Sequence, residues 1–299
     1  NNLEEIDEVL DKFNLPIVIK SDGLAAGKGV TICNSKKEAT QDIKNILKGK
    51  FETSKKVIVE EFLTGEEASY FVITDGENYI PIGTAQDHKK IGENDTGLNT
   101  GGMGAYSPSF LITDNVDFKI RTKIIEPTIK AMKKLGYPYK GILYAGLMIS
   151  KSEPKLIEYN IRFGDPECQV LMMRLKSDLL EIIQSTLNNS LNKIKINWKK
   201  DHCITVVAAS KGYPEKFEKL KEIKKIISFK ENSNQQLFHY STLKDEDGKI
   251  YSNSGRVLSS TVINTSLKEA RKIALKILDE IEWENKYYRR DIGFRIIDK

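Results

Sequence analysis

The chain has 299 residues, 39% hydrophobic and 30% charged, which suits a globular protein long enough for two domains with sizeable cores. Its apolar runs fall short of the roughly 18 residues that a membrane-spanning helix needs, so we expect no membrane partner. The net charge of +5 comes without a dense basic block interleaved with aromatic residues, so we expect no nucleic-acid partner.

Hydrophobic periodicity and turn residues predict a mixture of strands and helices, which indicates an α+β fold. The predicted elements in chain order are a helix at 3–13, strands at 16–20 and 30–33, a helix that starts at a capping box at 35–38 and closes at Gly49, strands at 57–62 and 69–74, a long glycine-rich loop at 85–108, a helix at 118–135, a hairpin of 141–150 and 155–160, a helix at 177–187, strands at 202–210, 223–229, 236–241 and 255–263, and a helix that starts at Ser266. The polar, lysine-rich segment 188–200 is the predicted domain boundary.

Cysteines and arginines are sparse, so each one is informative. The three cysteines, Cys33, Cys168 and Cys203, have no paired spacing, which predicts free thiols and indicates a reducing cytoplasm. Only 8 of the 47 Lys and Arg residues are arginines, and Arg differs from Lys at planar anion sites. The anion-site candidates, which lie in segments that contain Gly or Asp, are Arg162, Arg256, Arg289 and Arg290. The arginines expected on the surface of helices are Arg121, Arg174 and Arg271.

The segment 156–167, LIEYNIRFGDPE, reads as a strand that runs into a polar turn. Alternate residues of a strand share a face, so Glu158, Asn160 and Arg162 are expected to point the same way. Carboxylate and amide oxygens suit a hard cation such as Mg²⁺, and Arg suits a phosphate or a carboxylate. A metal beside an arginine suggests phosphoryl transfer, although a solvated edge strand would show the same pattern.

Two further segments predict nucleotide contacts. The loop 22–29, DGLAAGKG, follows the strand that ends at Lys20, and its glycines let backbone N–H groups approach phosphates. Its spacing differs from that of a Walker A loop, and a strand follows it, so it reads as a hairpin flap. The segment 57–67, VIVEEFLTGEE, is an apolar strand followed by acids, which suits an adenine slot and ribose hydroxyls.

In this order the motifs resemble the ATP-grasp superfamily, and within it the phosphoribosylamine–glycine ligase family of purine biosynthesis. The resemblance covers nearly the whole chain. It rests on VIKSDGLAAGKGV, EEFLTGEEAS, QDHKK, NTGGMGAYSP, GILYAGLMI, EYNIRFGDPE, SGRVL and RRDIGFR, at residues 18–30, 60–69, 86–90, 99–108, 141–149, 158–167, 254–258 and 289–295. The run NTGGMGAYSP is the most specific of these. Lys90, Leu98 and Ser254 depart from residues that are common in the family.

The resemblance implies an ATP-grasp domain at 1–190, with a nucleotide flap at about 14–75, and a small mixed α/β C-terminal domain at 200–299. The two α+β subdomains of the fold would clasp ATP. The family's N-terminal Rossmann-like domain is expected to be absent from this chain, which does not begin with Met.

The resemblance also assigns roles to individual residues. The implied ATP contacts are Lys20, Gly27, Lys28, Gly29, Glu60, Glu61, Phe62, Leu63 and Glu67. Glu158 and Asn160 are the implied ligands of Mg²⁺ or Mn²⁺, and Arg162 is the implied catalytic residue. The expected substrate contacts are Asp87, Asn99, Thr100, Gly101, Gly102, Asp165 and Arg256. The loop from Asn99 to Gly104 is expected to offer successive N–H groups as an anion nest.

The expected reaction joins glycine to 5-phosphoribosylamine through glycyl phosphate, at the expense of ATP, in a monomeric enzyme. For His88, a catalytic and a structural role remain open. Two other functions also remain open. One is another ATP-grasp activity, such as a carboxylase acting on biotin or an amino-acid ligase, which would lack the NTGGMGAYSP loop. The other is a nucleotide-binding fragment without catalysis, which would bind ATP without turnover.

Overall fold

The computed structural model describes residues 5–23, 29–51, 56–226 and 232–298. The chain divides into two compact units, residues 1–64 and residues 65–299, and each is described by itself. The predicted boundary at 188–200 stays a prediction, since strand β11 after it joins the same sheet as strand β8 before it.

The first unit is a three-stranded sheet with helices on one face. Its elements are α1 (Ile6–Leu10), β1 (Ile17–Ser21), β2 (Val30–Cys33), α2 (Lys36–Asn45), a π-helical turn (Ile46–Lys50) and β3 (Val57–Glu61). The sheet order is β2-β1-β3. The predicted cap is confirmed, because the Ser35 hydroxyl accepts the Glu38 N–H at 3.2 Å, and Gly49 ends the helical segment at a φ of 100°. Ile17, Ile19 and Ile43 form the core under the helix.

The second unit is built on one large sheet. Its strands up to the boundary are β4 (Glu66–Thr74), β5 (Tyr79–Asp87), β6 (Lys90–Gly92), β7 (Thr96–Asn99), β8 (Gly104–Ser107), β9 (Gly141–Ser150) and β10 (Glu153–Asn160). Beyond the boundary lie β11 (His202–Ser210), β12 (Glu222–Lys224), β13 (Gln235–His239), β14 (Thr242–Lys244), β15 (Ile250–Ser252), β16 (Arg256–Asn264), β17 (Glu282–Trp283) and β18 (Lys286–Tyr287). The main path of the sheet is β10-β9-β4-β5-β8-β11-β16-β13.

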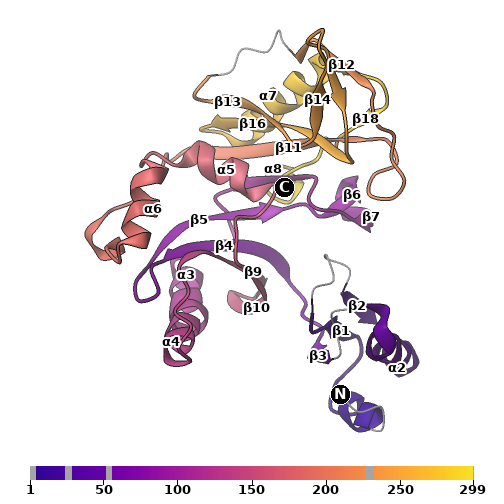
Figure 1. Ribbon diagram of the computed structural model, residues 1–299, viewed down its shortest axis with the longest axis vertical. Coiled ribbons are helices and arrows are strands. Elements are labelled where there is room, and N and C mark those ends of the chain that lie inside the picture. The colour runs from indigo at the N-terminus through magenta and orange to yellow at the C-terminus, as the bar shows by residue number, and fades with distance from the viewer. Residues whose placement is uncertain (1–4, 24–28, 52–55, 227–231, 299) are drawn as a thin grey trace. The chain divides into compact units, whose positions relative to one another are not determined.

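Helices cover both faces of the part of this sheet that contains β4 and β9 (Figure 1). The helices of the second unit are α3 (Asp114–Ile120), α4 (Glu126–Lys134), α5 (Glu167–Arg174), α6 (Leu179–Leu187), α7 (Leu267–Glu280) and α8 (Phe294–Ile297). Alternate residues of β4 serve the two faces: Tyr70 and Val72 pack in one core with α3 and α4. Phe71 and Ile73 pack in the other core with α5 and α6. The sheet is therefore buried along its middle.

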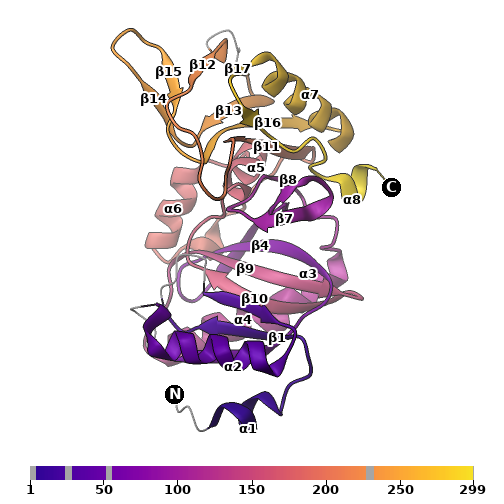
Figure 2. The same ribbon diagram turned by 90° about the vertical axis from the view of Figure 1, so that its right-hand side faces the viewer.

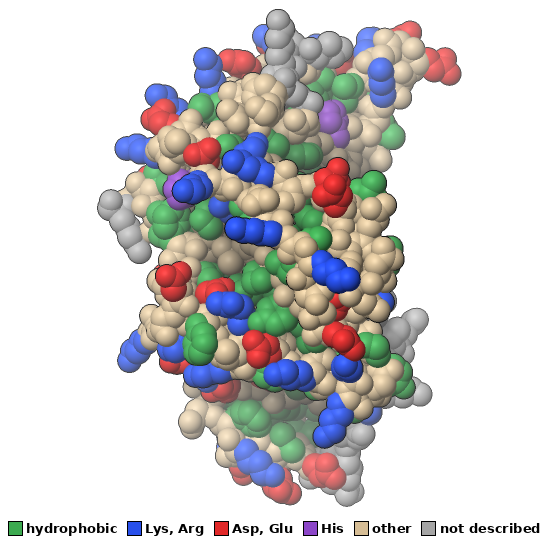
Figure 3. All heavy atoms as spheres, turned by 90° about the vertical axis from the view of Figure 1, so that its left-hand side faces the viewer, with side chains coloured by type: hydrophobic (Ala, Val, Ile, Leu, Met, Phe, Trp, Pro, Cys, Tyr) green, Lys and Arg blue, Asp and Glu red, His purple; other side chains and the backbone are tan. Residues whose placement is uncertain are grey.

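Charges of both signs are mixed over the face of the molecule in Figure 3. In the parts of the chain that the structure describes, no helix is long and apolar enough to cross a membrane.

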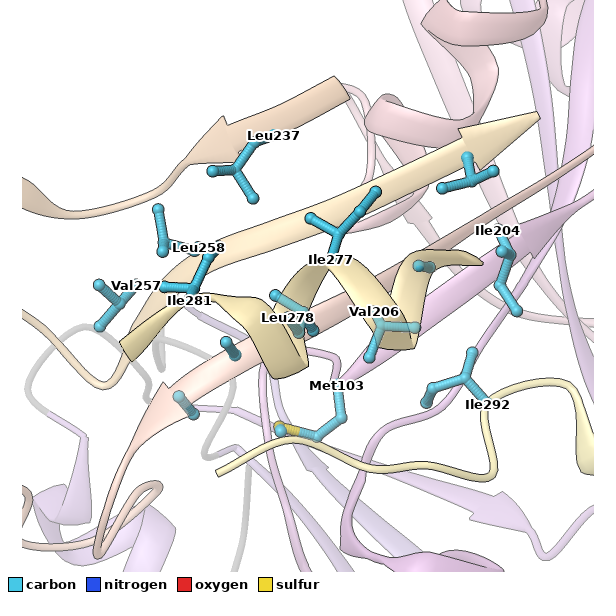
Figure 4. Close-up of a cluster of buried hydrophobic side chains, with 14 of the residues drawn as sticks. Met103, Ile204, Val206, Leu237, Val257, Leu258, Ile277, Leu278, Ile281 and Ile292 are labelled. Atoms are coloured by element: carbon cyan, nitrogen blue, oxygen red, sulfur yellow. The ribbon is translucent and has the colours of Figure 1, made fainter. Parts of the chain in front are cut away.

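The strands after residue 200 have a core of their own. Helix α7 packs against β11 and β16, as Figures 2 and 4 show, and buries Ala274, Ile277 and Leu278. The second predicted cap is confirmed here, because the Ser266 hydroxyl accepts the Glu269 N–H at 3.4 Å. Met103 from the glycine-rich segment joins this core (Figure 4), so the core fixes the position of that segment.

Three expectations about elements are wrong. The segment 85–108 is not one long loop, because it holds the end of β5, the paired strands β6 and β7, and β8. Helix α5 was not predicted, and the predicted helix at 118–135 begins earlier, at Asp114, where the Thr113 hydroxyl accepts the Val116 N–H at 3.4 Å.

Two of the arginines expected on the surface of helices are largely buried. Arg174 is 8% exposed and donates to Ser107 Oγ and to the carbonyls of Lys199 and Asp201. The side chain of Arg271 is 14% exposed and pairs with Asp298 at 2.6 Å.

Arg289 and Arg290 are not open anion sites either. Arg289 is fully buried and donates from two nitrogens to Asp291, and it also pairs with Asp95 at 2.9 Å. Its guanidinium holds the β6–β7 hairpin against the C-terminal segment, because it also donates to the Lys90 carbonyl at 3.0 Å. Arg290 pairs with Asp279 at the surface at 2.9 Å.

Candidate active site

Strand register places a row of polar side chains on one face of the sheet. Ser69 on β4 lies opposite Gly146 on β9 and Ala85 on β5, and Gly146 lies opposite Glu158 on β10. Residues two steps away along a strand share the same face. Glu67, Asp87 and Tyr144 therefore point to the same side of the sheet as Ser69 and Glu158. These side chains line one pocket, together with Lys89.

A buried carboxylate lies beside this pocket. Glu167, the first residue of α5, is 3% exposed, and its Oε1 accepts the hydroxyl of Ser69 at 3.0 Å and that of Tyr144 at 2.9 Å. A Cβ at Gly164 would lie 2.3 Å from Glu167 Oε2, so a glycine at 164 is what leaves room for this carboxylate. Burial, and then the Glu167 charge, raise the pKa of Tyr144. The Tyr144 hydroxyl thus keeps its proton.

Asp87 is the last residue of β5, and Lys89 follows it two residues later. Asp87 reaches the surface in part, but its Oδ1 is buried and accepts no hydrogen bond from the described residues. Burial, and then the neighbouring Glu167, raise the pKa of Asp87 well above its ordinary value. Lys89 forms an ion pair with Glu67. Burial acts to lower the pKa of Lys89, but the nearby carboxylates, Glu67 first, outweigh it, so that pKa is raised.

The predicted metal ligands lie together at the end of β10. Asn160 Nδ2 is 3.3 Å from Glu158 Oε1, and the Glu158 side chain is exposed. Among the described residues no group of three or more His, Cys, Asp and Glu could hold a metal. The pair therefore fits a Mg²⁺ ion whose other oxygen ligands come from phosphate and water. It does not fit a site in which protein side chains supply all the ligands.

Arg162 lies just beyond this strand. β10 ends at Asn160, so the expectation that Arg162 continues the same strand face is wrong. Its side chain is exposed, and its Nη1 donates to the Phe163 carbonyl at 2.7 Å. Its guanidinium pairs with no carboxylate in the described chain, which leaves it able to meet an anion.

The glycine-rich segment is closed by internal hydrogen bonds. The N–H groups of Thr100, Gly101, Gly102 and Met103 donate to Lys89 O, Tyr213 OH, Thr100 Oγ1 and His88 O, respectively. The expected anion nest is therefore wrong for these four amides. Asn99, the other predicted contact here, is exposed at the end of β7.

Two predicted substrate contacts bind one another. Arg256 Nη2 donates to Asp165 Oδ2 at 2.8 Å, and its Nη1 donates to the Gly101 carbonyl at 2.7 Å. Nη1 also reaches the Asp165 carbonyl at 3.0 Å, so Arg256 joins the glycine-rich segment to the turn before α5.

His88 has a structural environment. Its Nε2 accepts the Gly293 N–H at 3.1 Å, and the ring is 2% exposed beside Tyr106 and Phe294. Burial, and then Arg289, lower the pKa of His88 to about 4, so the imidazole is neutral. Lys90 starts β6 and contributes its carbonyl to Arg289.

The first unit brings two of the predicted ATP contacts together. Lys20 Nζ lies 2.6 Å from Glu60 on one face of its sheet. Around this pair the same face exposes Val30, Ile32 and Ile58, at 52%, 53% and 43%. Glu61 ends β3, and Phe62 and Leu63 follow it. Gly29 directly precedes β2, whereas Gly27 and Lys28 lie outside the described residues.

The roles of Ser69, Tyr144, Lys89 and Glu167 were not predicted from the sequence. Glu167 is the last residue of the polar segment 156–167, so the sequence includes it among the candidate residues. Only the structure shows that the hydroxyls of Ser69 and Tyr144, on two other strands, donate to it.

Two comparisons define the class of protein. Residues 1–168 match the family model described as phosphoribosylglycinamide synthetase, ATP-grasp (A) domain. A biotin carboxylase structure from Campylobacter jejuni, 18% identical, superposes with a TM-score of 0.69 over 99% of this chain and 63% of that one. At that identity it shows the fold alone. The chain has the predicted ATP-grasp fold, and the fold implies use of ATP and of a divalent metal.

Closer relatives identify the family. Residues 203–295 match the phosphoribosylglycinamide synthetase C domain. A phosphoribosylamine–glycine ligase of Agrobacterium fabrum is 50% identical over 283 residues, which is 94% of this chain and 66% of that protein. The solved structure of the Thermotoga maritima ligase is 33% identical, with a TM-score of 0.85 over 97% of this chain and 72% of that one. The chain belongs to the phosphoribosylglycinamide synthetase family, as the sequence resemblance predicted. It spans about two thirds of the length of these relatives.

Proposed function

We propose that the protein to which this chain belongs ligates glycine to 5-phosphoribosylamine, with ATP converted to ADP and phosphate. The observation that supports this most directly is the polar face of the β4–β5–β9–β10 sheet. That face brings the carboxylates of Glu67, Asp87 and Glu158 and the ammonium group of Lys89 into one pocket, in a chain whose relatives are named for this ligation.

In the first step, a glycine carboxylate oxygen attacks the γ-phosphorus and ADP leaves, which gives glycyl phosphate. Arg162, exposed two residues after Asn160 in the sequence, would stabilise the charge on the transferred phosphoryl group and the acyl phosphate. Glu158 and Asn160 would hold Mg²⁺ or Mn²⁺, which supplies charge neutralisation on phosphate oxygens.

In the second step, the amine of phosphoribosylamine attacks the carbonyl carbon of glycyl phosphate. The C–O bond to the phosphate breaks, an amide forms, and the amine nitrogen loses a proton. Arg256 and Asp165 would hold the glycine-rich segment at the substrate, because their contacts join it to the turn before α5.

For ATP itself, the supporting feature is the exposed apolar face of the first unit. An adenine ring binds to an apolar surface that has backbone hydrogen-bonding groups nearby. The apolar surface here is formed by Val30, Ile32 and Ile58, around Lys20 and Glu60. Glu61, Phe62 and Leu63 would give the backbone edge, Glu67 the ribose contact, and Gly27, Lys28 and Gly29 the phosphate contacts.

The oligomeric state, the cellular location and the domain limits belong to the same proposal. We infer a monomer in the cytoplasm, in line with three free cysteines. The domain limits 1–190 and 200–299 are likewise proposed; the first family match ends at residue 168 and the second begins at residue 203.

The test is ADP release by the full-length protein with ATP, glycine and freshly made phosphoribosylamine. We expect ADP release that requires both glycine and the amine. Release that ignores glycine, or ATP binding without turnover, would contradict the proposal and favour another ATP-grasp activity or a nucleotide-binding protein without catalysis.

A further inference from the structure

Gly101 ties the glycine-rich segment to the part of the chain after residue 200. The amides next to it bond within the segment or to the carbonyls of the two residues before β6. The Gly101 N–H instead donates to the Tyr213 hydroxyl at 2.9 Å, 112 positions away in the sequence. The Gly101 carbonyl accepts from Arg256 Nη1 at 2.7 Å. Two side chains from the later part of the chain therefore hold both polar groups of one residue.

The Tyr213 ring is placed by the residues that precede Arg256. A Cβ at Gly255 would lie 2.1 Å from Cδ2 of the Tyr213 ring, so the lack of a side chain at 255 leaves room for the ring. The Tyr213 N–H donates to the Ser210 carbonyl at 3.2 Å, and the Ser210 N–H donates to the Gly255 carbonyl at 2.7 Å. The ring also packs against the core that contains Met103. The Tyr213 hydroxyl is therefore held in place before it meets the glycine-rich segment.

The residue after Gly101 lies directly against the candidate active site. A Cβ at Gly102 would lie 2.8 Å from Asp87 Oδ1 and 2.3 Å from Pro166 Cδ, so the backbone at 102 packs against both. Closely packed groups do not shift independently of one another. A displacement of Gly101 would therefore also move Gly102 relative to Asp87 and to the turn before α5.

We propose that Tyr213 is a positioning residue for the second step of the ligation. By accepting the Gly101 N–H, its hydroxyl fixes the glycine-rich segment where phosphoribosylamine is held for attack on glycyl phosphate. A single exposed hydrogen bond contributes little to the free energy of unfolding, whereas a misplacement of about 1 Å can cost on the order of 10²-fold in rate. The inference rests on the proposed function and adds a residue that acts through the glycine-rich segment.

The experiment measures ADP release by the full-length enzyme carrying Tyr213→Phe, which keeps the ring and removes the acceptor oxygen. The KM for phosphoribosylamine should rise about tenfold, because the segment loses one of its two ties at Gly101. The KM for ATP and the midpoint of urea unfolding should stay unchanged. The matched control is Tyr139→Phe, because the Tyr139 hydroxyl also bonds one backbone group, the Ile142 carbonyl at 2.7 Å, but not in this segment. The control should leave all three quantities unchanged.

A second variant displaces the ring and keeps the hydroxyl. Gly255→Ala puts a methyl group where the Tyr213 ring lies, so the ring has to move. This variant should raise the KM for phosphoribosylamine at least as much as Tyr213→Phe does. Adding Tyr213→Phe to Gly255→Ala should raise that KM no further, because both changes remove the same contact with Gly101.

Three results would overturn the inference: Tyr213→Phe that behaves like the control, Tyr213→Phe that raises the KM for ATP as much as that for phosphoribosylamine, or a double variant in which the two effects multiply. If Gly255→Ala does not fold, Tyr213→Phe and its control decide. Wild-type enzyme without ADP release that depends on glycine and the amine would instead refute the proposed function, and the inference with it.

Discussion

The turn after β10 and the C-terminal segment after β18 each contain an arginine within a few residues of an acid in the sequence, yet the two arginines differ in whether their donors are paired. Arg289 is fully buried, and Asp291, Asp95 and the Lys90 carbonyl occupy its donors. Arg162 is exposed and bonds only its neighbour's carbonyl among the contacts of the described chain. A buried arginine with paired donors, such as Arg289, holds chain segments together. An exposed arginine without a carboxylate partner among the described residues, such as Arg162, can bind an anionic substrate.

The largest expected effect is the loss of the proposed metal ligand Glu158. Glu158→Ala should lower turnover roughly 10³-fold or more, because a metal contributes several kcal/mol of charge stabilisation. The fold should persist, since the side chain is exposed. Steady-state ADP release measures this, with Glu153→Ala as the control, an exposed acid on the same strand that pairs with Lys119. Near-normal activity of Glu158→Ala at low Mg²⁺ would contradict the assignment.

In the C-terminal segment around Arg289, the expected effect is on the free energy of unfolding. Arg289→Ala should cost roughly 3–5 kcal/mol of unfolding free energy, because it leaves Asp95 and Asp291 without their buried partner. Arg290→Ala, which removes an exposed pair with Asp279, should cost at most about 1 kcal/mol. Urea unfolding followed by fluorescence suits the comparison, since Trp198 and Trp283 both lie in the second unit. Equal costs for the two variants would show that burial does not separate them.

The open arginine should affect catalysis rather than stability. Arg162→Lys keeps the charge but loses the planar fork, so kcat should fall on the order of 10²-fold while ATP affinity changes little. Both quantities are measured on the full-length enzyme. Loss of ATP affinity with kcat preserved would place Arg162 at the nucleotide instead.

A smaller effect is expected on the pH dependence of stability, and it arises from His88. The pKa of His88 is lowered to about 4 by burial and Arg289, below its ordinary value of 6.5. The unfolded chain binds the extra proton first, so the stability from neutral His88 is complete above pH 6.5 and is lost as pH falls toward 4. Between pH 7 and pH 5 this loss is about 2 kcal/mol. Urea unfolding at both pH values should show a smaller loss for His88→Gln, and an identical loss would mean that His88 is not the group responsible.

Local pattern predicted much of the fold. The strands at 16–20, 30–33 and 202–210 and the caps at Ser35 and Ser266 agree closely with the structure, because apolar runs and capping residues act within a few positions. The β6–β7 hairpin was missed because it is polar and is held by Arg289, nearly 200 residues away in sequence.

In the candidate site, too, only the features formed by residues close in the sequence were predictable. The pair of Glu158 and Asn160 was predictable from spacing on one strand. The network of Ser69, Tyr144 and Glu167 was not, because it joins β4, β9 and the start of α5 across 98 positions. The anion nest failed in part for a related reason: the Gly101 amide donates to Tyr213, which is 112 positions away in the sequence.

The most direct test of the central claim follows one oxygen atom. The full-length enzyme is given glycine labelled with ¹⁸O in its carboxylate, together with ATP and phosphoribosylamine, and the inorganic phosphate is analysed by mass spectrometry. A glycyl-phosphate intermediate predicts one ¹⁸O in each phosphate released, because the glycine oxygen that attacks phosphorus leaves with it. Phosphate without the label would contradict the account, since glycine would then never have been phosphorylated.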